Sequence, residues 1–453
     1  MNVIIVGCGK VGFTLASSLV TENHNITLID KNQDAINNAL TSIDCMCVIG
    51  DGSMQSVLSE AKVEDADFLI ACTNSDEVNI LTCLFAKKNS KCRTIARIRN
   101  PEYSHEMDYF VKELDISLAI NPELATAREI SRMVRYPKSI SSDSFFKGRL
   151  NLLKAPIPPD SKVIGHKLHE ISKLCKSNIL ICAIERGDDV IIPTGNSMIE
   201  KDDNILFVAD HNNVISFFEN IGFSYKQLNS YMIIGASRVS YYLIDVLLKN
   251  KITNIKVIEK DLQRCEDLIS KFPNVSIVRS DGTDKNILLQ EGLGDVDVFV
   301  PLTGIDEENI ILSLLAKNYS SAKIITKVNH LNFIDALKEL NLGSIVNPER
   351  IAANIIVSYV RAASNASANN IETLYRLCND RIEGVGFIIK KENRVTNIRI
   401  KDLKLKKDVL IAGIYRHGNV IRPNGNDTLN VGDSVVIISK DNFLHDIEDI
   451  LVE

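Results

Sequence analysis

The first residues of the chain, Met1–Gly12, are MNVIIVGCGKVG, and they specify the fold of the N-terminal domain. The apolar run Val3–Val6 has the length and the β-branched composition of a buried strand. Directly after it, Gly7–Gly12 carries glycines in the spacing G-x-G-x-x-G at the start of an expected helix. In this motif the first glycine makes a tight turn, the second lets the backbone approach a pyrophosphate, and the third lets the helix pack on the strand. The stretch predicts a nucleotide-binding α/β domain.

An acidic residue completes this pattern. Asp30 ends the expected second strand, Ile26–Asp30, and follows Gly12 by 18 residues. A carboxylate at this position holds the hydroxyls of a ribose, and its charge favours NAD(H) over NADP(H) because it would repel a 2′-phosphate. The alternative is a glycine turn that serves only packing. The expected cofactor contacts in this region are Gly7, Cys8, Gly9, Lys10, Val11, Gly12, Asp30 and Lys31.

Further candidates follow the ends of later strands, where the crevice of such a sheet opens. Asp51 and Gly52 follow the third expected strand, near the adenosine end, although Asp-Gly-Ser also suits a turn and a helix N-cap. Thr73 and Asn74 end the fourth strand, with helix capping as the alternative role. Arg97 ends the fifth strand and would face the phosphates, unless it is an exposed arginine in a salt bridge.

Residues 1–138 alternate apolar strands with amphipathic helices such as Val78–Lys88. This order predicts the α/β class and a doubly wound parallel sheet of the Rossmann type. Pro137 and the polar stretch Ser139–Ser144 mark a boundary, after which short strands and turn dipeptides predict a small α+β module. The strands expected in the first sheet are Asn2–Val6, Ile26–Asp30, Cys45–Ile49, Phe68–Cys72, Arg93–Arg97 and Ile116–Ile120.

The whole pattern then occurs a second time in the same order. Gly7 and Gly235 lie 228 residues apart, and Asp51 and Asp281 lie 230 apart. A duplicated two-part unit explains one constant long spacing, whereas a solenoid would repeat every few tens of residues. The polar stretch Ser364–Asn370 takes the place of the first boundary. The predicted domains are a Rossmann-like domain at 1–138, a small α+β module at 145–225, a degenerate Rossmann-like domain at 230–363 and a second small module at 371–453.

The second copy of the glycine motif has changed. Ser237 and Ser240 stand where the first copy has its second and third glycines, while the acids Glu259 and Asp281 remain and stay candidate contacts. A side chain at the second glycine position occupies the space that the phosphate backbone needs. The second half is therefore expected to bind a dinucleotide weakly or not at all, and the first half is the expected sensor.

The composition excludes several classes of protein. The chain has 453 residues, is 45% hydrophobic and carries a net charge of −6, so neither disorder nor general nucleic-acid binding is indicated. It contains no uncharged apolar run long enough to span a membrane and opens without a signal peptide. Its ten cysteines form no disulfide framework. A cytoplasmic protein is expected.

No catalytic set accompanies the nucleotide motif. The pair Cys45 and Cys47 invites a metal or a redox interpretation, but no second cysteine pair or histidine cluster accompanies it, so a packed strand is expected there. Cys8 is expected to be a small residue in a tight turn. The histidines of the small modules do not recur at equivalent positions in the two copies, and surface histidines are the preferred interpretation: His166, His169, His211, His417 and His445.

These residues together resemble a known family. The strand with its glycine motif, Asp30, and the segments CTNSDEVN from Cys72, ARIRNPEY from Ala96 and INPE from Ile120 are similar to the RCK (KTN) domains that regulate potassium channels and transporters. The small modules, clearest in LNVGDSVVII from Leu429, resemble the C-terminal module of that family. The duplicated order without membrane spans resembles the TrkA-like peripheral subunits of Trk potassium-uptake systems.

The resemblance implies a regulatory protein and not an enzyme. It implies a cytoplasmic ring, a dimer or tetramer of two-unit chains, that lies on the inner face of the plasma membrane and gates a membrane potassium-translocating subunit. NAD(H), or ATP or ADP, would bias the ring between its shapes. By position, Gly7, Gly9 and Gly12 would hold pyrophosphate, Asp30 the ribose and Arg97 a phosphate. The alternatives are an NAD-dependent oxidoreductase that uses the first half and a nucleotide sensor with a soluble partner.

Overall fold

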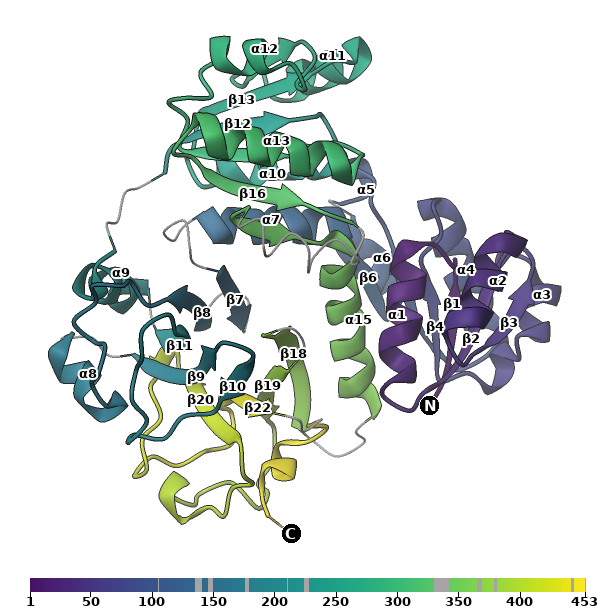
Figure 1. The fold of residues 1–453 in the computed structure, drawn as a ribbon. Coiled ribbons are helices and arrows are strands. Elements are labelled where there is room, and N and C mark those ends of the chain that lie inside the picture. Colours follow the sequence, from purple (N-terminus) through teal and green to yellow (C-terminus); the bar gives the residue numbers. More distant parts are fainter. Residues whose placement is uncertain are drawn as a thin grey trace. The chain divides into compact units, whose positions relative to one another are not determined.

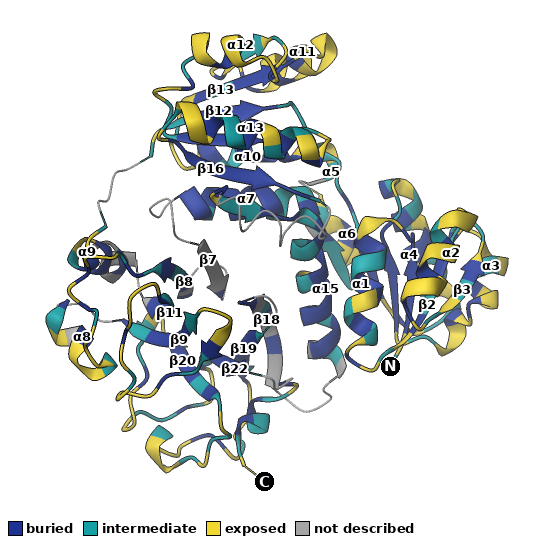
Figure 2. Ribbon diagram, in the orientation of Figure 1, coloured by how far each residue is buried: buried dark blue, intermediate teal, exposed yellow. Residues whose placement is uncertain are grey.

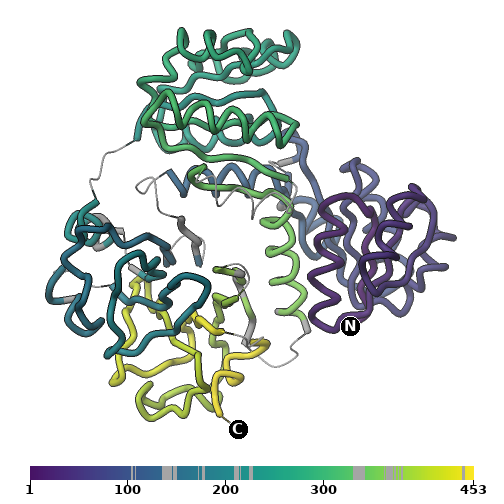
Figure 3. Tube along the Cα trace, in the orientation of Figure 1, coloured from purple at the N-terminus to yellow at the C-terminus, as the bar shows by residue number. Residues whose placement is uncertain are grey.

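A computed structural model describes the chain from Met1 to Val452 except residues 105, 135–140, 146–149, 176–178, 210, 224–227, 330–341, 365–368, 379–380 and 441–443. The described residues divide into two compact units. One contains 1–134 and 228–357, and the other contains 135–227 and 358–453. Each unit therefore consists of two separate segments of the chain, which can be followed by colour along the trace in Figure 3.

The first half forms the predicted doubly wound parallel sheet. Its strands follow the order β3-β2-β1-β4-β5-β6, with β1 paired in parallel to both β2 and β4. The order reverses at β1, so the crevice of the sheet opens where β1 and β4 end. All the predicted strands are present, which confirms the fold class. The strands are β1 (Asn2–Val6), β2 (Asn25–Asp30), β3 (Met46–Ile49), β4 (Phe68–Ala71), β5 (Arg93–Arg97) and β6 (Leu118–Ile120).

Helices and a short 3-10 turn connect these strands. The central strands are buried on both faces, as Figure 2 shows, because helices cover each side of the sheet. The connecting helices are α1 (Lys10–Val20), α2 (Gln33–Ser42), α3 (Gln55–Glu60), η1 (Val63–Asp65), α4 (Asp76–Asn89), α5 (Pro101–Ser104), α6 (Met107–Glu113) and α7 (Pro122–Val134).

The second half repeats this sheet in the same strand order, β14-β13-β12-β15-β16-β17. Its strands are β12 (Ser230–Ile234), β13 (Asn254–Glu259), β14 (Ser276–Arg279), β15 (Val298–Pro301), β16 (Lys323–Lys327) and β17 (Ser344–Val346). Its helices are α10 (Arg238–Lys249), α11 (Leu262–Lys271), α12 (Lys285–Gln290), α13 (Asp306–Tyr319) and α15 (Pro348–Ser364), the last of which continues into the other unit. Figure 1 shows both sheets.

Helix α7 joins the two halves of this unit. It follows β6 of the first sheet, yet its apolar residues Ala127, Ile130 and Met133 belong to the core of the second half, together with residues of α10. The side chain of Asn250 donates to Ser131 Oγ at 3.3 Å, and Lys323 Nζ donates to the carbonyl of Met133. A helix from the first half is thus built into the second half, so the two Rossmann-like parts cannot separate without exposing this core.

The other unit combines the two small modules. Their sheets have the orders β10-β9-β11-β8-β7 and β18-β19-β22-β20-β21, with antiparallel pairing throughout the described ladders. Both sheets contribute to one hydrophobic cluster, which contains Leu150 and Cys182 of the first module and Ile382 and Val436 of the second. A Cβ on Gly413 would lie 2.3 Å from Leu150 Cδ1, so the two modules pack tightly.

The elements of the small modules begin earlier than the sequence indicated. Strand β7 starts at Ser141, so part of the stretch expected as a linker forms the edge strand of its sheet. Pro137 lies outside the described residues. The first module contains β7 (Ser141–Phe145), β8 (Leu150–Pro156), α8 (Leu168–Leu174), β9 (Leu180–Arg186), β10 (Asp189–Ile191), β11 (Asn204–Ala209) and α9 (His211–Ile221). The second contains β18 (Asn369–Leu377), β19 (Ile382–Ile389), η4 (Ile400–Asp402), β20 (Val409–Arg416), β21 (Asn419–Ile421), β22 (Ser434–Lys440) and η5 (Ile447–Ile450).

Candidate functional site

The glycine loop of the first half lies between β1 and α1, and the space around its three glycines differs. Gly7 has φ of +103°, and a Cβ there would lie 2.9 Å from the backbone nitrogen of Thr73. A Cβ on Gly12 would lie 1.9 Å from the carbonyl oxygen of Gly7. In contrast, a Cβ on Gly9 would meet no atom within 4 Å. The backbone of the first half therefore leaves no room for a side chain at the first and third glycines, while the space above Gly9 is open.

The N-terminus of α1 offers donors to an anion. The N-cap of α1 is Gly9, which has no side chain to accept hydrogen bonds from the first turn, and that turn contains no acidic residue. The first backbone N–H groups of a helix have no partner within the helix and carry a partial positive charge. Lys10 is exposed at this end, whereas Cys8 and Val11 are buried and belong to the core. The loop backbone and Lys10 are thus suited to phosphate.

In the second half the corresponding loop satisfies its own donors. The Ser237 side chain caps α10 by accepting the backbone N–H of Ser240 at 3.3 Å. In turn, Ser240 Oγ donates to the carbonyl of Gly235 at 2.6 Å and accepts the N–H of Ser237 at 3.2 Å. Side chains therefore occupy the position that is open in the first half. The two loops therefore differ in structure, and the expected difference in nucleotide binding stays a prediction.

The acid at the end of the second strand fixes the loop in both halves. Asp30 Oδ2 accepts the N–H of Cys8 at 2.6 Å, and Oδ1 accepts the N–H of Asn32 at 2.8 Å. In the second half, Glu259 accepts the N–H of Ala236 at 2.6 Å in the same way. A carboxylate has about four acceptor positions, so each acid retains capacity for a ribose hydroxyl. Asp30 and Glu259 are thus positioned beside the loops and also hold them.

The residues near the expected adenosine end have clear local roles. Asp51 Oδ1 accepts both the N–H of Ser53 at 2.9 Å and its hydroxyl at 2.7 Å, and these hydrogen bonds lower the pKa of Asp51. Lys31 is exposed, and its charge lowers the same pKa further. A Cβ on Gly52 would lie 2.1 Å from Val6 Cγ1, so packing requires this glycine. Asp281 binds Thr283 at matching distances in the second half.

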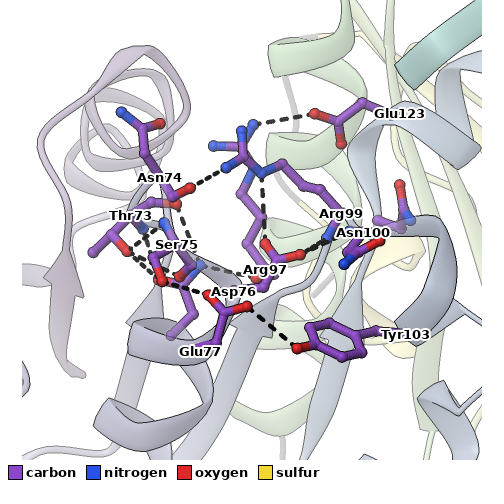
Figure 4. Close-up of polar contacts among 12 residues, drawn as sticks. Thr73, Asn74, Ser75, Asp76, Glu77, Arg97, Arg99, Asn100, Tyr103 and Glu123 are labelled. Atoms are coloured by element: carbon purple, nitrogen blue, oxygen red, sulfur yellow. Dashed lines mark hydrogen bonds and ion pairs between the residues drawn. The ribbon is translucent and has the colours of Figure 1, made fainter. Parts of the chain in front are cut away.

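Thr73 and Asn74 follow β4, and a buried asparagine fixes their loop. Asn79 Oδ1 accepts the Thr73 N–H at 2.8 Å and its hydroxyl at 2.7 Å, and Asn79 Nδ2 donates to the carbonyl of Arg97 at 2.8 Å. The N-cap of α4 is Ser75, so neither candidate caps the helix directly. Asn74 is exposed in the loop after β4, and its carbonyl accepts from Arg99. Figure 4 shows Thr73, Asn74 and Ser75 of this loop.

Two arginines at the end of β5 converge with acids on the same place (Figure 4). Arg97 is largely buried, with 13% of its side chain exposed, and pairs with Glu123 at 3.5 Å. The salt bridge of the alternative interpretation is therefore present, but the arginine is not exposed. Arg99 pairs with Asp76 at 3.6 Å. Burial and the charges of Arg97 and Arg238 lower the pKa of Arg99, while Glu123 and Asp76 raise it.

This cluster contains buried polar atoms without a hydrogen-bond partner among the described residues. They include Arg97 Nε and Glu123 Oε2, whereas Arg99 Nε faces Asp76 Oδ1 in the ion pair described above. Burying a polar atom without a hydrogen bond costs free energy, so these two atoms are available to a polar ligand. With the open space above Gly9 and the donors of α1, they fit the requirements of a phosphate-containing ligand at the crevice of the first sheet.

The site residues expected from the sequence did not include Asp76, Asn79, Arg99, Glu123 and Tyr242, although the first four lie in the motifs that carry the resemblance. Comparison of the two copies also indicates Asp76, Asn79 and Glu123, because they recur as the buried residues Asp306, Asn309 and Glu349. Tyr242 carried no such signal. Its hydroxyl donates to the carbonyl of Arg99 at 2.9 Å and accepts from Asn121 at 2.8 Å, which links the site to the second half.

Other kinds of site find no support in the described part of the chain. Its His, Cys, Asp and Glu side chains form no group of three or more that could hold a metal ion. None of the helices in this part has both the length and the apolar character needed to cross a membrane.

Comparison with known proteins gives one consistent family. The model of the TrkA-N domain matches residues 3–122 and 231–348, and the model of the TrkA-C domain matches residues 152–222 and 385–452. The chain belongs to the TrkA family. The Trk system potassium uptake protein TrkA of Vibrio alginolyticus is 30% identical over 454 residues, which cover 99% of this chain and 98% of that protein. TrkA homolog 1 of Methanosarcina mazei is 28% identical over 455 residues, 99% of each chain.

Solved structures agree with this fold. The RCK domain of GsuK covers 97% of this chain and 92% of its own, with a TM-score of 0.62 and 16% sequence identity. The GsuK channel bound to NAD covers 97% of this chain and 77% of its own, with a TM-score of 0.61 and 17% identity. At this sequence identity the similarity shows that the chain has the fold of these RCK domains. It gives no information about ligands.

Proposed function

We propose that this protein is the peripheral regulatory subunit of a Trk-type potassium-uptake system and that it binds NAD(H) in its first half. The observation that carries the proposal is the difference between the two loops. The space above Gly9 is open and α1 is uncapped, whereas Ser237 and Ser240 fill the second loop. The curated relatives are potassium uptake proteins along their whole length, which supports the potassium system.

Different residues of the first half would bind different parts of the ligand. The backbone of Gly7–Gly12 and Lys10 would hold pyrophosphate, and Asp30 would hold a ribose through its free acceptor positions. Asp51 and Gly52 would lie near adenosine. Thr73, Asn74 and Arg97 would lie at the other side of the crevice, where Arg97 would give its unsatisfied Nε–H to a phosphate. ATP or ADP is the alternative ligand, because the same groups suit any adenosine phosphate.

Regulation would follow from ligand linkage. A nucleotide shifts an equilibrium between two shapes only by its difference in affinity for them. The site touches the second half through the Arg99 carbonyl and Tyr242, so a ligand that moves the end of β5 would move α10. We propose that the chain assembles into a ring, as a dimer or tetramer, on the cytoplasmic face of the membrane and gates the potassium-translocating subunit.

An enzyme would need an acid, base or nucleophile beside the nicotinamide. The polar groups at the crevice, Arg97, Arg99, Asp76 and Glu123, are held in ion pairs with one another. We therefore infer a regulatory and not a catalytic role. NADH absorbance that stays constant with small-molecule substrates would agree with this, and a substrate-dependent decrease would favour an oxidoreductase.

Two measurements test the proposal. NADH titrated into the full chain should saturate at one molecule per chain, and Asp30→Asn should weaken binding while Glu259→Gln, its matched control in the second half, should not. Saturation at two per chain, or equal effects of the two variants, would refute the assignment to the first half.

The partner is tested in membranes. The protein should co-purify with a potassium-translocating subunit, and NADH should change potassium flux through the reconstituted complex. A protein that stays entirely with soluble partners would instead be a stand-alone sensor, and flux unaffected by nucleotide would contradict the gating role.

A further inference from the structure

Two of the ten cysteines are more exposed than the other eight. Eight are buried, while Cys45 and Cys47 are partly exposed. These are also the two whose sulfur atoms lie close together, with Cys45 Sγ and Cys47 Sγ 3.8 Å apart. Residues two apart along an extended chain project to the same face, which explains the contact. The structure thus brings its two more exposed thiols into one pair.

The fold does not require thiols at these positions. The second half has Val275 and Ile277 at the equivalent places beside β14, which suit a half-buried strand. Cys8 and Cys72, in the core near the glycine loop, likewise correspond to Ala236 and Leu302. The same sheet is therefore built without cysteine in the second half.

Cys47 lies in an edge strand, β3, and Cys45 directly precedes it. Strand β3 is at the edge of its sheet and pairs with β2 alone, with Cys47 opposite Leu28. It also leads directly into Gly50–Gly52. There a Cβ on Gly52 would lie 2.1 Å from Val6 Cγ1, so this turn has little room to shift.

We propose that Cys45 and Cys47 form a redox-active dithiol, and that closing it into a disulfide weakens nucleotide binding in the first half. The second part of this statement rests on the proposed function. The oxidant that we propose for this reaction is a low-molecular-weight disulfide of the glutathione type.

The reaction balances as thiol–disulfide exchange. The Cys45 thiolate attacks one sulfur of the disulfide and releases one thiolate, which leaves a mixed disulfide on Cys45. The Cys47 thiolate then attacks the Cys45 sulfur, forms the protein disulfide and releases the second thiol. Two electrons pass from the protein to the reagent. Burial raises the pKa of both thiols, that of Cys47 to about 12, so the reaction is faster at alkaline pH.

Disulfide geometry explains the effect on the site. The sulfurs must approach from 3.8 Å to about 2.0 Å, and residues two apart in a strand have Cα atoms roughly 6.7 Å apart, at the upper end of the range for disulfides. The strand before Gly50 must therefore contract. The contraction pulls on the turn that carries Asp51. Because Gly52 packs directly against Val6, this turn can follow only if it loses that packing at the end of β1.

The test uses the full chain in buffers of oxidised and reduced glutathione, with free thiols alkylated and the peptides identified by mass spectrometry. The wild type should form the Cys45–Cys47 disulfide. Cys45→Ser should instead retain glutathione on Cys47, and Cys265→Ser, a buried control, should behave as the wild type. Absence of the disulfide at every ratio would overturn the proposal.

NADH titrations test the second part. The oxidised wild type should bind NADH at least about 10-fold more weakly than the reduced protein, a change of about 1.4 kcal/mol, and reduction should restore binding. The control carries Cys45→Val and Cys47→Ile in the first half with Val275→Cys and Ile277→Cys in the second, and oxidation should leave its affinity unchanged. Equal affinities in the wild type would refute the coupling. A reduced protein that binds no NADH would refute the proposed function, whatever the state of the thiols.

Discussion

The substitution Gly9→Ser separates the nucleotide site from the stability of the fold. Gly9 has φ of −72° and ψ of −173°, a conformation that any residue adopts. A Cβ there meets no protein atom within 4 Å, so serine should be accommodated without strain. The variant also gives the first half the residue that Ser237 supplies in the second half, where it caps α10.

The two effects have opposite signs. Without ligand, a serine N-cap in place of glycine should stabilise the protein by a few tenths of a kcal/mol. With ligand, the side chain takes the space where a phosphate must approach the N–H groups of α1. Hydrogen bonds to a charged group contribute about 1.5–3 kcal/mol, so losing one should weaken NADH binding by about 10- to 100-fold.

Thermal denaturation with and without NADH measures both effects on one sample. At a concentration of 100 times its Kd, NADH should stabilise the wild type by about 2.7 kcal/mol, and a 100-fold weaker variant should gain only about 0.4 kcal/mol. Ser237→Gly is the matched control, and it should lose a few tenths of a kcal/mol without any change in NADH affinity. Wild-type NADH affinity in Gly9→Ser would refute the assignment of this loop, and a marked loss of stability would show that the space is not open.

Three further variants test the long-range contacts. Tyr242→Phe should lower the free energy of unfolding by about 1–3 kcal/mol in urea, because it leaves the amide of Asn121 buried without its partner; an unchanged midpoint would contradict this. Burial lowers the pKa of Lys323 from 10.5 to about 7, so between these pH values Lys323 is protonated in the unfolded chain but not in the folded one. The free energy of unfolding should therefore rise with pH across this range, and Lys323→Met should abolish that rise in urea denaturation. Arg361→Met should cost about 3–5 kcal/mol because it strands Glu383, and adding Glu383→Leu should recover most of the loss; equal costs for single and double variants would argue against the pair.

Much of the fold was accessible from the sequence because it is encoded locally. The strand Asn2–Val6 was predicted with the bounds that the structure has, and Phe68–Cys72 was predicted one residue too long. A continuous apolar run marks a parallel strand buried on both faces, and such runs need no knowledge of distant residues. The start of the first small module was less accessible, since the polar edge strand from Ser141 has the composition of a linker.

The candidate site divides in the same way. Gly7, Gly12 and Asp30 could be assigned from spacing, and the structure gives each a contact that depends on that spacing. Arg97 was named from its strand end alone. Its burial against Glu123 could not be foreseen, because the two are 26 residues apart and belong to different elements.

Residue order alone is enough to predict the sheets, their duplication and the loss of the second glycine loop. These properties depend on periodicity, on residue size and on one internal comparison. Residue order does not indicate that like domains combine into one unit, with α7 of the first half in the core of the second. That pairing, and the hydrogen bonds of Tyr242 with Asn121 and Arg99, join residues more than 100 positions apart. Which buried face meets which depends on shape and on the satisfaction of polar groups, and these are properties of the folded chain as a whole.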